Sequence, residues 1–240
     1  MTSVKHLLAT ALAATCLTCG DSSGPNTGGS VTLGQGTLTS FMRLDPNGDP
    51  DTIGVVFDAG LLQGLPAADT FMTVALGSQA TGTIYTHLYF DFVHMGHGPL
   101  GVFDTAHFDL HWYFISDQER MTIQPMIDTY TVAAAKLPPN YAKATESVQR
   151  MGVHYADTLA PEFQGGLFDI AMVYGFHEGT FTFYDLMVTR HWLLTHPDTV
   201  HTLGLPTNYP LPGHYPTKWS VRYNAATQQY RIAIEGFVAR

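Results

Sequence analysis

Short apolar runs alternate with polar and turn residues along most of the chain. The runs are rich in β-branched and aromatic side chains, and Gly, Pro, Asp or Asn stands between them, which is typical of strands joined by turns. We therefore predict a mainly β fold, a single-domain barrel or sandwich with one to three short helices. The predicted strands cover residues 31–42, 54–59, 71–76, 83–93, 107–115, 169–174, 180–184, 219–223 and 230–237.

Two segments differ from this pattern, because their composition favours a helix over a strand. They cover residues 140–150 and 186–196. We predict a short helix in each, and no second linker or repeat that would divide the chain further.

The segment 107–115 (HFDLHWYFI) carries the most informative alternation. Alternate side chains of a strand share a face, so one face of this strand is polar and the other is apolar. The polar face shows His107, Asp109, His111 and Tyr113. The apolar face belongs against a core. An exposed strand face more often shows Thr, Lys or Glu, so the polar row indicates the lining of a cavity.

Strand geometry limits how this row could bind a metal ion. At about 3.3 Å per residue, His107 and His111 lie roughly 13 Å apart, too far to bind one ion unless a bulge intervenes. Residues two positions apart are about 6.6 Å apart and can converge. An ion would therefore be bound by His107 with Asp109, or by Asp109 with His111, together with ligands from other strands.

Other polar residues could complete such a site. The predicted ligand set is His107, Asp109, His111, His154 and Asp185. Additional candidates are His97 and Glu178, together with His87 and Asp91, which share a face of the strand predicted at 83–93, and with His94 and His177. Two or three histidines with a carboxylate suit Zn²⁺, Fe²⁺, Mn²⁺ or Cu²⁺.

The same row has a simpler interpretation. Buried His paired with Asp is also common in hydrogen-bond networks that bind nothing, and the sequence has no HExxH motif. The two readings stay open on the sequence alone.

The first 19 residues have the layout of a bacterial secretory signal peptide. Lys5 precedes a short apolar run at residues 6–14, and the chain turns polar after Cys19. A cysteine at this boundary is typical of lipoproteins, and we predict lipid attachment at Cys19, with Cys16 as the second candidate. An ordinary signal peptide with incidental cysteines is the alternative.

These features predict how the chain is organised and where it works. Residues 1–19 are a lipoprotein-type signal peptide, residues 20–30 a flexible tether, and residues 31–240 one β-rich domain. We expect an extracytoplasmic protein, in the periplasm or at the cell surface, held to the membrane by a lipid anchor. No cysteine follows Cys19, so a disulfide within the domain and thiolate catalysis are both excluded.

The net charge of the chain argues against nucleic acid as a partner. The chain has 20 Asp and Glu against 11 Lys and Arg, and its net charge at pH 7 is −9. An acidic chain without a basic run is a poor binder of nucleic acid.

Four segments together resemble a bacterial domain of unknown function that occurs in Thermus and in many envelope lipoproteins. They are GHGP at 96–99, HFDLH at 107–111, MGVH at 151–154 and PGHYPT at 212–217. The family pattern has a Glu before Pro-Met in a later strand, where this chain has Asp185, Leu186 and Met187. The acid is kept, but the shorter Asp reaches less far. The resemblance implies a β-rich fold, export and self-association as a homo-oligomer, and it implies no activity.

Three functions are compatible with the sequence. The first is a binding protein that holds a metal ion or a small ligand in a cavity lined by His and Asp. The second is a metal-dependent enzyme, of hydrolase or oxygenase type, that uses the same residues with His154 or Asp185 as a base. The third is a structural or assembly protein whose polar row is only a hydrogen-bond network.

Overall fold

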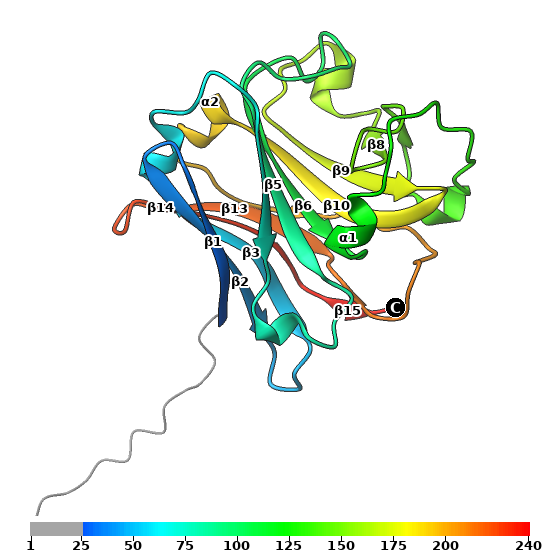
Figure 1. The fold of residues 1–240 in the computed structure, drawn as a ribbon, viewed down its shortest axis with the longest axis horizontal. Coiled ribbons are helices and arrows are strands. Elements are labelled where there is room, and N and C mark those ends of the chain that lie inside the picture. The colour runs from blue at the N-terminus through cyan, green and yellow to red at the C-terminus, as the bar shows by residue number, and fades with distance from the viewer. Residues whose placement is uncertain (1–25) are drawn as a thin grey trace, which may run out of the picture.

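Two antiparallel sheets pack face to face as a sandwich, shown in Figure 1, in a computed structural model that describes residues 26–240. Neither sheet closes into a barrel within that part of the chain. The prediction of a mainly β fold with few helices is confirmed, and of the two architectures the sandwich is the one adopted.

The first sheet has six strands, and both ends of the described chain contribute to it. In spatial order these are β1 (Asn26–Leu33), β2 (Gly36–Leu44), β3 (Pro50–Asp58), β14 (Gln229–Glu235), β13 (Lys218–Asn224) and β11 (Asp198–Thr202). A separate pair of two-residue strands consists of β12 (His214–Tyr215) and β15 (Val238–Ala239).

The second sheet has seven strands, and β6 lies near its middle. In spatial order these are β4 (Thr70–Ala75), β5 (His87–Val93), β6 (His107–Tyr113), β10 (Thr180–Thr189), β9 (Ile170–His177), β8 (Val153–Asp157) and β7 (Tyr141–Lys143). The α-helices of the described chain are α1 (Asp117–Arg120) and α2 (Arg190–Leu193). Short 3₁₀ turns cover Ala59–Leu62, Ser78–Ala80, Ala134–Lys136 and Pro161–Gln164.

The main core lies between the sheets. The apolar face of β6 points into it, and Phe108, Leu110 and Trp112 are at most 2% exposed. The Trp112 indole N–H donates a hydrogen bond to the Ile53 carbonyl at 3.1 Å, which joins the second sheet to β3 of the first. The predicted division of this strand into an apolar and a polar face is therefore confirmed.

Both predicted helices need correction. Residues 140–150 contain no helix, because Tyr141–Lys143 pair with β8 as a strand. In the segment 186–196, the strand β10 continues to Thr189 and pairs with both β6 and β9. Only Arg190–Leu193 are helical, and the Thr189 hydroxyl accepts the Trp192 N–H at their N-terminus.

The N-terminal predictions are tested only in part. The signal peptide and both cysteines lie outside the described residues. Strand β1 begins at Asn26, so residues 26–30 belong to the first sheet and not to the predicted tether. Between residues 26 and 240, the chain forms no helix with the length and apolar character needed to cross a membrane.

Candidate metal centre

The polar face of β6 is covered, although it points away from the core between the sheets. Every residue of β5 and β6 is buried. Two segments, 97–103 and 144–151, contribute side chains that lie over this face. The polar groups are therefore removed from bulk water, where an unpartnered charge is costly.

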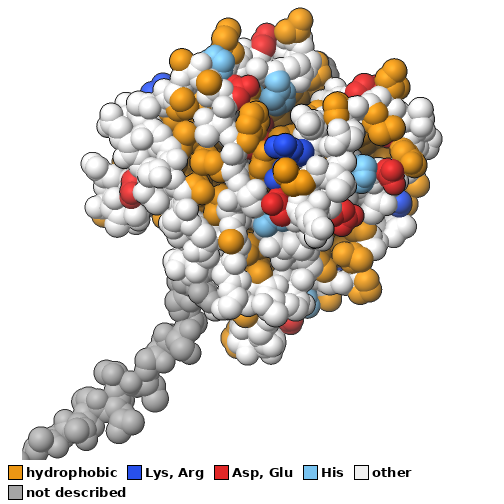
Figure 2. Space-filling view, in the orientation of Figure 1, with side chains coloured by type: hydrophobic (Ala, Val, Ile, Leu, Met, Phe, Trp, Pro, Cys, Tyr) orange, Lys and Arg blue, Asp and Glu red, His pale blue; other side chains and the backbone are white. Residues whose placement is uncertain are grey.

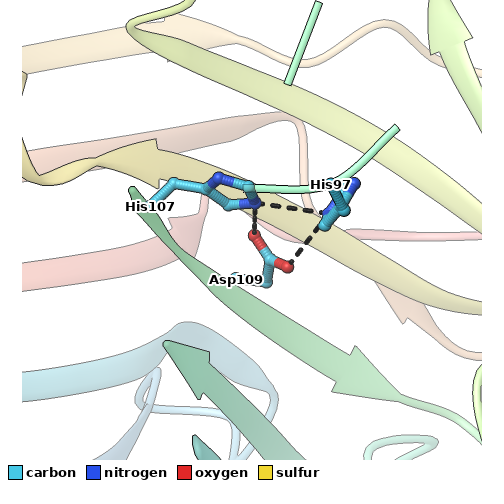
Figure 3. A group of neighbouring side chains, drawn as sticks. All are labelled: His97, His107 and Asp109. Atoms are coloured by element: carbon cyan, nitrogen blue, oxygen red, sulfur yellow. Dashed lines mark hydrogen bonds and ion pairs between the residues drawn. The ribbon is translucent and has the colours of Figure 1, made fainter. Parts of the chain in front are cut away.

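The first cluster consists of His97, His107 and Asp109 (Figure 3). The Nε2 atoms of the two histidines are 3.2 Å apart. Asp109 Oδ1 lies 3.2 Å from His107 Nε2, and Asp109 Oδ2 lies 3.6 Å from His97 Nε2. His107 and Asp109 come from β6, whereas His97 comes from the loop between β5 and β6, so the loop closes the cluster from the outside.

Backbone carbonyls determine where the protons of these imidazoles lie. His107 Nδ1 is 2.6 Å from the Thr105 carbonyl, and His97 Nδ1 is 2.8 Å from the Gly98 carbonyl. A carbonyl oxygen only accepts, so Nδ1 carries the proton in both rings. In the neutral rings both Nε2 atoms then present lone pairs to each other and to the Asp109 carboxylate. Metal-binding histidines typically have their second nitrogen held in this way.

The spacing of the three groups fits a small ion. Ligand atoms at 2.0–2.1 Å from a tetrahedral Zn²⁺ are separated from one another by about 3.3 Å. The separations within the first cluster, 3.2, 3.2 and 3.6 Å, are close to this value.

Without an ion, electrostatics holds the same cluster together. Burial opposes ionisation of Asp109, but the neighbouring His107 and His97 outweigh it and keep the pKa of this carboxyl far below its ordinary value. Burial also opposes protonation of His97, yet its contact with Asp109 raises the pKa of His97 above the usual range. A proton on His97 is therefore the natural competitor of a metal ion.

The second cluster consists of His111, His154 and Asp185, from β6, β8 and β10. Asp185 Oδ2 lies 3.7 Å from His111 Nε2 and 4.0 Å from His154 Nε2. The His111 Nδ1 proton is donated to the Tyr89 carbonyl at 3.1 Å, so Nε2 of the neutral ring again faces a carboxylate with a lone pair. Burial lowers the pKa of His111 to about 4 and that of His154 to about 3. Both rings are therefore neutral near pH 7.

Asp91 adds a third buried carboxylate. It stands directly opposite Asp109 in the pairing of β5 with β6, it is 0% exposed, and neither of its oxygens has a hydrogen-bond partner among residues 26–240. Burial and then the Asp109 charge raise the pKa of Asp91 well above its ordinary value. Burial, Asp109 and Asp91 raise the pKa of Asp185 in the same way.

A cavity of about 320 Å³ opens onto both clusters. Its walls are mainly apolar and include Phe71, Phe103, Val148, Met151 and Met187. Its polar side chains include His97 and Asp109 of the first cluster, His154 of the second, and Asp91. A ligand in this cavity would thus meet both clusters on one side and apolar walls on the other.

The sequence predicted a single ligand set, whereas the structure divides these residues between two clusters. His107 and His111 do not share an ion site, as the strand spacing predicted. His97, only an additional candidate, is a full member of the first cluster. Glu178 lies exposed in the turn after β9 and belongs to neither cluster.

The remaining candidates lie outside both clusters. His94 Nδ1 lies 3.0 Å from Asp69, and His87 Nε2 lies 3.6 Å from Asp117. Burial lowers the pKa of His87 to about 4. His177 ends β9 and is not part of either cluster.

Comparisons with protein-family models, with curated proteins and with solved structures found no match to this chain. The clusters themselves are therefore the basis for assigning a function.

Proposed function

We propose that this chain is an exported lipoprotein of the bacterial cell envelope whose β sandwich binds a divalent transition-metal ion through His97, His107 and Asp109. Two imidazole nitrogens and a carboxylate are ligands that suit Zn²⁺, Fe²⁺, Mn²⁺ or Cu²⁺. The signal-like N-terminus and Cys19 support the location.

The observation that carries the proposal is the convergence of three lone-pair donors in the first cluster. Both imidazoles give their Nδ1 proton to a backbone carbonyl, so neither neutral ring has a proton to place between Nε2 and the Asp109 carboxylate. Only a cation or an extra proton relieves this arrangement. Three ligand atoms at tetrahedral spacing, beside a cavity that leaves room for a fourth ligand, favour a cation.

Metal analysis of the protein purified without a polyhistidine tag tests this. After loading with Zn²⁺ or Co²⁺ and dialysis, the His97→Ala/His107→Ala double variant should retain one equivalent less metal than the wild type. His191→Ala is the matched control, because His191 forms a surface pair with Asp169 at 2.6 Å and should leave the metal content unchanged. Equal metal content in the wild type and the double variant would contradict the proposal. The cluster would then be a proton-bridged hydrogen-bond network in a structural protein.

A metal-dependent hydrolase is the second candidate function. A divalent ion bound in such a site would activate a water molecule for attack. The specific observation in its favour is Asp91, a carboxyl group that lines the same cavity, has no hydrogen-bond partner within residues 26–240 and could hold a proton. A screen of small esters and phosphoesters with metal-loaded wild type and Asp91→Asn would detect this activity. Hydrolysis at the wild-type rate in Asp91→Asn would show that Asp91 takes no part in the reaction.

A further inference from the structure

We infer that His111, His154 and Asp185 bind a second divalent ion, so that the protein holds a pair of neighbouring ions with Asp91 and Asp109 beside them. This inference rests on the proposed function and deepens it. It concerns how many ions the centre holds and what kind of ligand the cavity takes.

The second cluster repeats the feature that marks the first. His111 is fixed by the Tyr89 carbonyl, and its Nε2 has no hydrogen-bond partner within residues 26–240, although it faces Asp185. The other Asp185 oxygen, Oδ1, is also buried and has no hydrogen-bond partner among the described residues. A purely structural network would use these atoms in hydrogen bonds, because unsatisfied buried polar atoms cost stability.

A single ion cannot serve both clusters. His107 of the first cluster and His111 of the second are four residues apart on β6, which separates their Cα atoms by about 13 Å. Each cluster gathers its three ligand atoms within 4.8 Å of one another. Two ions held in this way would lie side by side above β6.

The carboxyl groups beside the clusters also favour more than one ion. Asp91, Asp109 and Asp185 are all buried, and the nearby Arg120 is already paired with Asp117 at 2.7 Å. Each ion would counter the charge of the carboxylate that binds it.

Two neighbouring divalent ions indicate the class of ligand. They would attract an anionic oxygen ligand: hydroxide in the resting protein, or the carboxylate or phosphate group of a small molecule. The apolar walls of the cavity would favour a molecule that carries an apolar group next to its anionic end.

The two sites should not be equal. Separations of 3.7 and 4.0 Å in the second cluster are wider than the tetrahedral value of about 3.3 Å. Binding must draw these side chains together by a few tenths of an ångström. We therefore expect the first cluster to fill before the second during a titration.

Metal stoichiometry separates this inference from the proposed function. Co²⁺ is titrated into the untagged full-length protein, and bound metal is counted after dialysis. We expect two equivalents in the wild type, one in Asp185→Asn and one in His97→Ala/His107→Ala. His191→Ala should again bind the wild-type amount. If Asp185→Asn fails to fold, His154→Gln carries the same test, because His154 lies on β8 with its side chain 12% exposed.

Each outcome bears on a different statement. One equivalent in the wild type, lost only in the first-cluster variant, would overturn the second ion and leave the proposed function intact. Two equivalents that survive both Asp185→Asn and His154→Gln would place the second ion elsewhere and overturn the inference. Absence of metal from the wild type would overturn both proposals.

Spectroscopy tests whether the ions are neighbours. Loading with two equivalents of Cu²⁺ should give an electron paramagnetic resonance spectrum broadened by spin coupling, since ions several ångströms apart interact strongly. The spectrum of Asp185→Asn with one equivalent should be that of an isolated ion. A wild-type spectrum that is the simple sum of isolated ions would overturn the paired arrangement.

Discussion

The two sheets share one core, but their outer faces differ in how far they are buried. In the first sheet, burial alternates along β11, and side chains such as Thr37 on β2 are exposed. In the second sheet, β5 and β6 are buried on both faces. Figure 2 shows only scattered Lys and Arg side chains on the viewed face. The outer face of the second sheet therefore encloses polar groups, an arrangement that stability alone does not favour.

Removal of Trp112 should have the largest effect on this comparison, because its ring joins the two sheets. Trp112→Ala leaves a cavity in the core and breaks the hydrogen bond to Ile53. We expect a loss of about 3–5 kcal/mol in the free energy of unfolding, measured with urea. A loss below about 1 kcal/mol would show that the core does not depend on this contact between layers.

Metal should stabilise the second sheet through its outer face. A free Zn²⁺ concentration about a hundredfold above the dissociation constant of the first cluster should add about 2.7 kcal/mol to the free energy of unfolding. His97→Ala should show less stabilisation at the same concentration, because His97 is the exposed member of that cluster. Equal stabilisation of variant and wild type by Zn²⁺ would indicate binding elsewhere.

The variant Asp91→Asn should show how much the enclosed polar face lowers the free energy of unfolding in the absence of metal. Asp91→Asn replaces a buried carboxyl group that has no hydrogen-bond partner in the described part of the chain, and we expect the metal-free variant to be about 1–2 kcal/mol more stable than the wild type. Urea unfolding in the presence of a chelator measures this. Destabilisation would mean that the carboxyl group is satisfied within the fold.

Substitution of Thr37 should have the smallest effect on the free energy of unfolding, and it serves as the reference for the other variants. It lies exposed on β2 of the first sheet, so Thr37→Ala should change the free energy of unfolding by no more than about 0.5 kcal/mol. A larger change would mean that the outer face of the first sheet is also covered, for example by a second copy of the chain. The contrast between the sheets would then disappear.

Local alternation was enough to predict the strand that organises the site. The two faces of residues 107–113 follow from a period of two, and the separation of His107 from His111 follows from the rise per residue. The helix predicted at 140–150 failed because strand pairing with β8 overrode local composition. In the segment 186–196, pairing with β6 and β9 overrode it in the same way as far as Thr189.

The assembly of the site could not be predicted, because it depends on register between distant strands. Asp91 and Asp109 face each other only through the pairing of β5 with β6, and Asp185 meets His111 only through the pairing of β10 with β6. His97 lies in a loop, where no periodicity applies. Its neighbour Gly98 and the nearby Gly96 were the available signals, together with the resemblance at GHGP.

The unequal exposure of the first cluster has a consequence for kinetics. The His97 side chain is 41% exposed, whereas those of His107 and Asp109 are 0% and 6% exposed. Of the three side chains, His97 is the one that an incoming chelator reaches most easily from solvent. Exchange of a bound ion would therefore proceed by stepwise ligand substitution that begins at this loop, and movement of the loop would limit the rates of binding and release.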